Sequence, residues 1–158
     1  MTSEKKQEFT LRISGANKTQ MITILYEIFL CYADEAIDAL GLGKKDEAQC
    51  SLDRAQGCLD ELIRSLDLRF ELAGRLHKIY LFSKKELTVA GATGSINKIW
   101  RVEQNIKTLH EAYKELEKFD RTPPMMDNIQ TVYAGLTYGR SALNESIAAS
   151  SMNRGYVC

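Results

Sequence analysis

Proline is absent from the first 122 residues, and the only two prolines, Pro123 and Pro124, stand side by side. Because proline breaks helices and favours turns, its distribution shows where a helix can run without interruption. The proline-free stretch is rich in Leu, Ala, Glu, Lys and Gln, which have high helix propensity. The sequence therefore predicts long helices joined by glycine-containing turns, with a break at the proline pair.

Apolar periodicity predicts four helices, over residues 18–40, 44–67, 69–90 and 95–120. Asn17 is the expected N-cap of the first, and Gln20 follows three residues later, as in a capping box. Four helices of this length with short links bury their apolar stripes most simply as an antiparallel four-helix bundle. The fold class predicted is all-α.

The two ends of the chain differ from this pattern. Phe9, Leu11 and Ile13 alternate with polar residues, which predicts an extended arm too short to be a stable strand alone. Beyond the proline pair we expect a C-terminal extension that forms a shorter fifth helix near residues 140–151. We expect one helical-bundle domain over residues 1–158, comprising an arm (1–16), a four-helix core (17–120) and an extension (121–158).

Charge and hydropathy exclude several classes of protein. Lys+Arg and Asp+Glu both number 21, whereas a general nucleic-acid binder normally carries a basic excess. The longest apolar run, residues 21–33, is shorter than the roughly 20 residues that span a bilayer. The N-terminus has no apolar segment of the kind found in secretory signals. We expect a cytoplasmic protein with no nucleic-acid partner and no membrane insertion.

The chain contains none of the motifs HExxH, GxGxxG, GxSxG or the phosphate-binding P-loop. Metal sites in helical bundles often use Glu-x-x-His pairs, but Gly74 precedes His77 by three residues and Lys107 precedes His110 by three. We therefore expect no enzymatic activity, no catalytic residues, no metal and no cofactor.

What remains is surplus apolar surface. The segment 18–40 carries two adjacent apolar stripes, so it must be buried on more than one side. One explanation is that the arm and the extension complete a larger core; the other is a groove for a partner's amphipathic helix. The candidate groove residues are Ile22, Tyr26, Phe29, Tyr80 and Phe82, and the candidate covering arm is Phe9, Leu11 and Ile13. For Tyr26 a core position with a bonded hydroxyl is an equal alternative, and for Tyr80 the core is slightly favoured.

Three stretches of the chain resemble the FliS-type flagellin export chaperones. They are residues 16–21 followed by Leu25-Tyr26-Glu27, the run Glu61-Leu62-Ile63-Arg64-Ser65-Leu66-Asp67, and Glu71-Leu72-Ala73 with Leu76, Ile79-Tyr80 and Leu87. Asn17-Lys18 stands where the family has Ser-Pro, and Tyr113 where it often has Trp.

The resemblance implies a helical chaperone that binds the disordered C-terminal segment of flagellin in the cytosol. Such binding prevents premature filament polymerisation and supports flagellar type III export, with the export apparatus as an indirect partner. We expect a monomer or weak homodimer. Two alternatives stay open: an adaptor for another amphipathic helix, and a self-associating structural bundle. A further hypothesis is that apolar residues of the extension, from Val132 to Ile147, occupy the flagellin groove.

Overall fold

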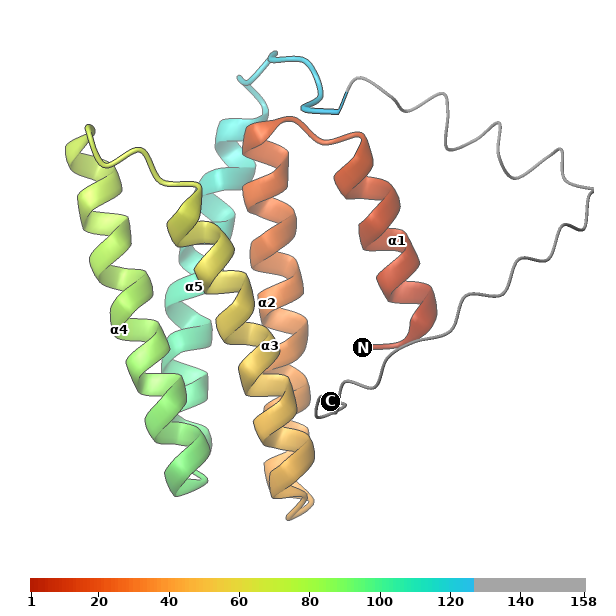
Figure 1. Ribbon diagram of the computed structural model, residues 1–158, viewed down its shortest axis with the longest axis vertical. Coiled ribbons are helices and arrows are strands. Elements are labelled where there is room, and N and C mark those ends of the chain that lie inside the picture. The colour runs from red at the N-terminus through yellow and green to blue at the C-terminus, as the bar shows by residue number, and fades with distance from the viewer. Residues whose placement is uncertain (127–158) are drawn as a thin grey trace, which may run out of the picture.

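A computed structural model describes residues 1–126, and within that range the chain forms five helices and no strand. The helices are α1 (Ser3–Ser14), α2 (Lys18–Gly41), α3 (Lys45–Arg64), α4 (Glu71–Thr93) and α5 (Ile96–Glu117) (Figure 1). The all-helical class predicted from the sequence is confirmed. The predicted fifth helix near residues 140–151 lies outside the described residues, and the division into domains stays a prediction.

Four of the helices pack in a closed cycle. α2 contacts α3 and α5, and α4 contacts the same two helices, while α1 packs against α2 (Figure 1). Consecutive helices from α2 to α5 are joined by short links and lie side by side. This packing is consistent with the predicted antiparallel four-helix bundle.

The core is built from the apolar stripes that the sequence shows. The stripe of α3, with its alternating spacing of three and four, is buried at Leu52, Leu59 and Leu62. α4 approaches α3 closely at Gly91, where an added Cβ would lie 3.3 Å from Leu52 Cδ1. The helix continues past this glycine and ends at Thr93, where the following Gly94 caps it with a left-handed φ of 69°. The sequence placed the end at residue 90.

The start of α2 forms as predicted. The Asn17 side chain accepts a hydrogen bond from the Gln20 backbone N–H, and the Gln20 side chain accepts one from the Asn17 backbone N–H. The segment after α5 packs against this cap, since Asn17 Nδ2 donates to the Thr122 carbonyl at 3.3 Å. The Met125 N–H also donates to the Ala16 carbonyl at 3.0 Å. The residues around the proline pair therefore fasten the junction between α1 and α2.

The predicted extended arm is wrong, because residues 3–14 form helix α1. Thr2 caps the helix by accepting a hydrogen bond from the Lys5 N–H. The alternation of Phe9, Leu11 and Ile13 suggested an extended chain, but in the helix Phe9 and Ile13 share one face while Leu11 is 54% exposed. The helical spacing of four, rather than the strand spacing of two, decides which side chains are buried.

Candidate functional site

Three of the five predicted groove residues lie in the core. Tyr26, Phe29 and Tyr80 are fully enclosed and belong to the main apolar cluster of the bundle. α3, α5 and α1 all pack against α2, so most of its apolar surface is covered by neighbouring helices. In this arrangement a partner has no direct access to these three side chains.

The buried tyrosines satisfy each other. The hydroxyl groups of Tyr26 and Tyr80 hydrogen-bond across the core, and the ring of Tyr113 meets that of Tyr26 edge-on, with centroids 5.6 Å apart. Burial raises the pKa of Tyr80 to about 12 and raises the pKa of Tyr26 still further above its usual value. Both hydroxyls therefore stay protonated, and the pair is a structural link between α2 and α4. This is the core alternative that the sequence left open.

Ile22, the fourth candidate, is half-buried and lines an open cleft at one end of the bundle. We call it the Ile22 cleft. Its volume is about 240 Å³, and it is lined by the start of α2, the α3–α4 link, the start of α4 and the end of α5. Its apolar walls include Phe70 and Leu72, both more than half exposed. An apolar residue presented at this cleft would find apolar partners.

Phe82, the fifth candidate, is 46% exposed and lines a second cleft, between α4 and α5. This Phe82 cleft has a volume of about 420 Å³ and a mostly apolar lining that includes Ile79 and Leu109. Lys78, Asn105 and Thr108 supply its polar lining. The exposure of a large aromatic side chain beside an apolar cleft is typical of a binding surface.

The structure does not bring Ile22 and Phe82 into one cleft, but it places the two clefts along the same pair of helices. On α4 the lining passes from Leu76 to Ile79, and on α5 from Tyr113 to Leu109. These steps of three and four residues are single helical turns. The two clefts are therefore neighbouring positions along the α4–α5 side of the molecule.

Helix α1 covers a different surface, on α2. Phe9 packs with Ala16 and Ile24 in a small apolar cluster separate from the main core, and Ile13, Ile28 and Cys31 lie at its edge. We call Ile24, Glu27, Ile28 and Cys31 of α2 the covered face. Of the predicted covering residues, Phe9 and Ile13 contact this cluster and Leu11 does not belong to it. A cleft of about 290 Å³ remains beside α1, so the helix does not seal the surface completely.

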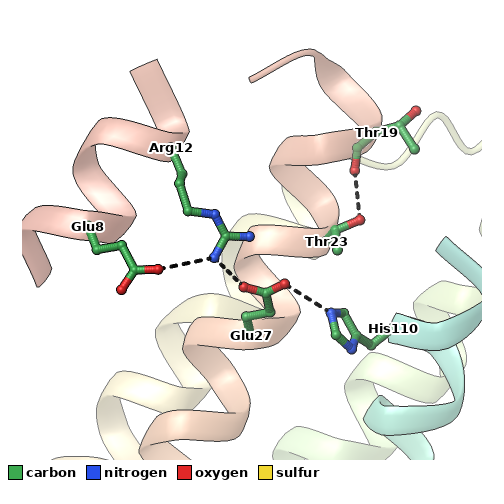
Figure 2. A network of polar contacts seen from close by, with 6 residues as sticks. All are labelled: Glu8, Arg12, Thr19, Thr23, Glu27 and His110. Atoms are coloured by element: carbon green, nitrogen blue, oxygen red, sulfur yellow. Dashed lines mark hydrogen bonds and ion pairs between the residues drawn. The ribbon is translucent and has the colours of Figure 1, made fainter. Parts of the chain in front are cut away.

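A polar network joins α1 to α2 and α5 at this face (Figure 2). Arg12 Nη1 of α1 donates to Glu27 Oε2 of α2 at 2.5 Å, and Glu27 Oε1 lies 3.3 Å from His110 Nε2 of α5. Glu8 lies 4.0 Å from the same Arg12 nitrogen. Glu27 thus connects three helices through its two carboxylate oxygens.

The environment of Glu27 holds it ionised although it is largely buried, with a side chain 20% exposed. Burial disfavours the charged carboxylate, but the hydrogen bond and charge of Arg12, together with His110, outweigh it and lower the Glu27 pKa. Conversely, the hydrogen bond to Glu27 raises the Arg12 pKa. Each of these two charges therefore offsets the cost of burying the other.

Sequence reasoning missed Glu27, Arg12 and His110 as a group. They are 15 and 83 residues apart in the chain, so no local motif marks them. One signal was present, because Glu27 is an acidic residue inside the long apolar run of residues 21–33. A charge in such a run is expected to have a partner.

Two other kinds of site are absent from the part of the chain that the structure describes. Within residues 1–126 there is no group of three or more His, Cys, Asp or Glu side chains that could hold a metal ion. In the same range, none of the helices combines the length and apolar content that crossing a bilayer demands.

Apolar clefts along two helices, with a short helix laid over a third, are features through which helical proteins can bind a partner's amphipathic helix. The chain belongs to the FliS family, described as flagellar protein FliS, whose model matches residues 1–119. The family is one of flagellar export chaperones, which are generally non-enzymatic. Among curated proteins, no match to the chain is found.

Proposed function

We propose that this protein is a cytoplasmic export chaperone that binds the C-terminal amphipathic segment of flagellin. Binding would hold that segment away from other flagellin subunits, prevent premature polymerisation and keep the subunit ready for type III export. The observation that carries the proposal is the family match over residues 1–119. The exposed apolar side chains along α4 and α5 supply a surface of suitable character.

The proposed binding surface begins with the Ile22 and Phe82 clefts. An amphipathic segment laid along α4 and α5 inserts apolar side chains into the two clefts, one after the other. Tyr26, Phe29 and Tyr80 support this surface from within the core. Burial of apolar area drives binding, so we expect a negative heat-capacity change and a small salt dependence.

Helix α1 has a second role in the proposal. It rests on α2 through a small apolar cluster and the Arg12–Glu27 ion pair, and the Met1 ammonium just before it pairs with Glu35 of α2. This is still a limited contact compared with those among α2 to α5. A partner helix that competes for the covered face displaces α1 and gains that surface too. In the free chain, α1 then keeps the covered face of α2 away from water, and flagellin takes its place on binding.

The decisive experiment mixes the full chain with flagellin and with flagellin lacking its C-terminal segment. Size-exclusion chromatography with light scattering measures the products, and calorimetry measures the affinity. We expect a one-to-one complex with the first and none with the second. Equal binding of both flagellins contradicts the proposal in favour of another adaptor role. A stable homo-oligomer without flagellin binding favours self-association.

A further inference from the structure

Helix α1 shows what kind of helix the covered face accepts. Its contact side includes Phe9, Arg12 and Ile13, which follow one another at spacings of three and one. Nearer the N-terminus, Lys5 lies beside Cys31 and the Met1 ammonium pairs with Glu35 of α2. The two apolar residues contact Ile24 and its neighbours. The cation between them contacts Glu27 (Figure 2). The seated helix is therefore a template with an apolar residue, a basic residue three positions later, and a second apolar residue directly after it.

Glu27 makes the basic residue of that template necessary. If α1 leaves and a wholly apolar helix takes its place, Glu27 loses Arg12 and stays beneath the new helix with only His110 beside it. A carboxylate buried without its cation is strongly destabilising. The charge thus selects among otherwise similar amphipathic helices by penalising those that bring no cation.

The surrounding charges favour the same type of partner. Glu8, Glu27 and Glu117 all interact electrostatically with Arg12 and raise its pKa. Glu27 and Glu117 belong to α2 and α5, so both remain when α1 is displaced. The exposed surface is then acidic as well as apolar, and it complements a helix with a basic residue.

We infer that Glu27 is a specificity-determining residue of the covered face, which accepts a partner helix carrying Lys or Arg between two apolar residues. The inference rests on the proposed displacement of α1 and adds the charge that the displacing segment must present. The position of the base in the partner copies that of Arg12 in α1.

Two substitutions each remove one partner of the Arg12–Glu27 ion pair. Comparing them distinguishes a role of Glu27 in selecting the partner helix from a role in holding α1 in place. Arg12→Gln loosens α1 and leaves Glu27 free to meet the partner, so we expect roughly three-fold tighter flagellin binding. Glu27→Gln also loosens α1 but removes the carboxylate, so we expect binding roughly ten-fold weaker than that of Arg12→Gln. Calorimetry measures both, with circular dichroism to verify folding.

The matched control is Glu111→Gln, which removes one exposed acidic charge next to His110 in the sequence of α5. We expect it to bind flagellin as the unmodified chain does. Equal tightening by Arg12→Gln and Glu27→Gln would mean that Glu27 only fastens α1, and would overturn the inference.

A peptide experiment tests the role of Glu27 without flagellin. The probe is a synthetic peptide copying residues 2–15, with Gln in place of Arg12 in a second version. The receptor is the full chain carrying Phe9→Ala, which weakens its own α1. We expect the Arg peptide to bind roughly five-fold more tightly than the Gln peptide, and the difference to vanish when Glu27→Gln is added to the receptor.

The two experiments fail separately. Absence of flagellin binding by the unmodified chain overturns the proposed function, and the peptide cycle then decides the inference alone. A peptide preference that persists without the Glu27 carboxylate overturns the inference and leaves the proposed function standing.

Discussion

The covered face of α2 and the open clefts of α4 and α5 are both apolar surfaces outside the main core, but they differ in what satisfies them. On α2 a helix of the same chain supplies the apolar partners and a compensating cation. Along α4 and α5, Phe82 and Leu72 stay in contact with solvent. The first surface must be uncovered before a partner can use it, whereas the second is accessible from the start.

The difference teaches that apolar residues with helical spacing in a sequence can occupy at least three environments in the fold. Phe29 lies in the core, Ile24 lies beneath α1, and Phe82 lies at the surface. These three side chains have similar hydrophobicity, and the helices that pack around each one determine how deeply it is buried.

The largest effect is expected for Phe29→Ala, because Phe29 is fully enclosed in the main cluster. Removing its ring leaves a cavity, and we expect a loss of about 3–5 kcal/mol in the free energy of unfolding. Urea unfolding followed by circular dichroism measures it. The exposed Leu81, changed to Ala, is the control, with an expected change within about 0.5 kcal/mol. If the free energy of unfolding falls by as little as in the control, Phe29 lies on a partner-facing surface rather than in the core.

An intermediate effect is expected for Phe82→Asp. The substitution places a charge in the Phe82 cleft, so we expect flagellin affinity to fall by about 2 kcal/mol, or roughly 30-fold, with the free energy of unfolding nearly unchanged. Leu81→Asp is the matched control, since Leu81 is equally exposed one position earlier and does not line the cleft. If both variants lose affinity equally, the cleft has no special role.

The smallest effect concerns pH. The Glu27 pKa is lowered in the docked state, so ionised Glu27 favours docking of α1 above the ordinary carboxyl pKa of about 4.3. This stabilisation is lost as pH falls through the lowered value, by less than about 1 kcal/mol. Backbone NMR shifts of α1 measure the undocking in acid. Arg12→Gln should flatten this pH profile. The Phe82 cleft has no carboxylate in its lining, so the backbone shifts around it should not change over the same pH range.

The positions of the four long helices could be predicted because each carries its own periodic stripe and end signals. The Asn17–Gln20 capping box and the stop near Gly94 are local features of the chain. Not every end was placed correctly. α3 ends at Arg64 rather than residue 67, before a link that contains no glycine, and α4 continues through Gly91 to Thr93 instead of ending at residue 90.

The candidate site was less predictable, because burial depends on neighbours that are distant in sequence. The apolar surplus of α2 was correctly noticed, but α1, α3 and α5 cover most of it. The short alternation in residues 9–13 fits a strand and a helix equally well, and the Thr2 cap and the contact with α2 favour the helix. The Glu27 network needs three helices in place before it can exist.

The hydrogen bonds from Asn17 to Thr122 and from Met125 to Ala16 have a mechanical consequence. They anchor the pivot about which α1 would turn, two residues ahead of the first turn of α2. With this pivot anchored, the proposed displacement would move α1 without unwinding α2, and the core would keep its order.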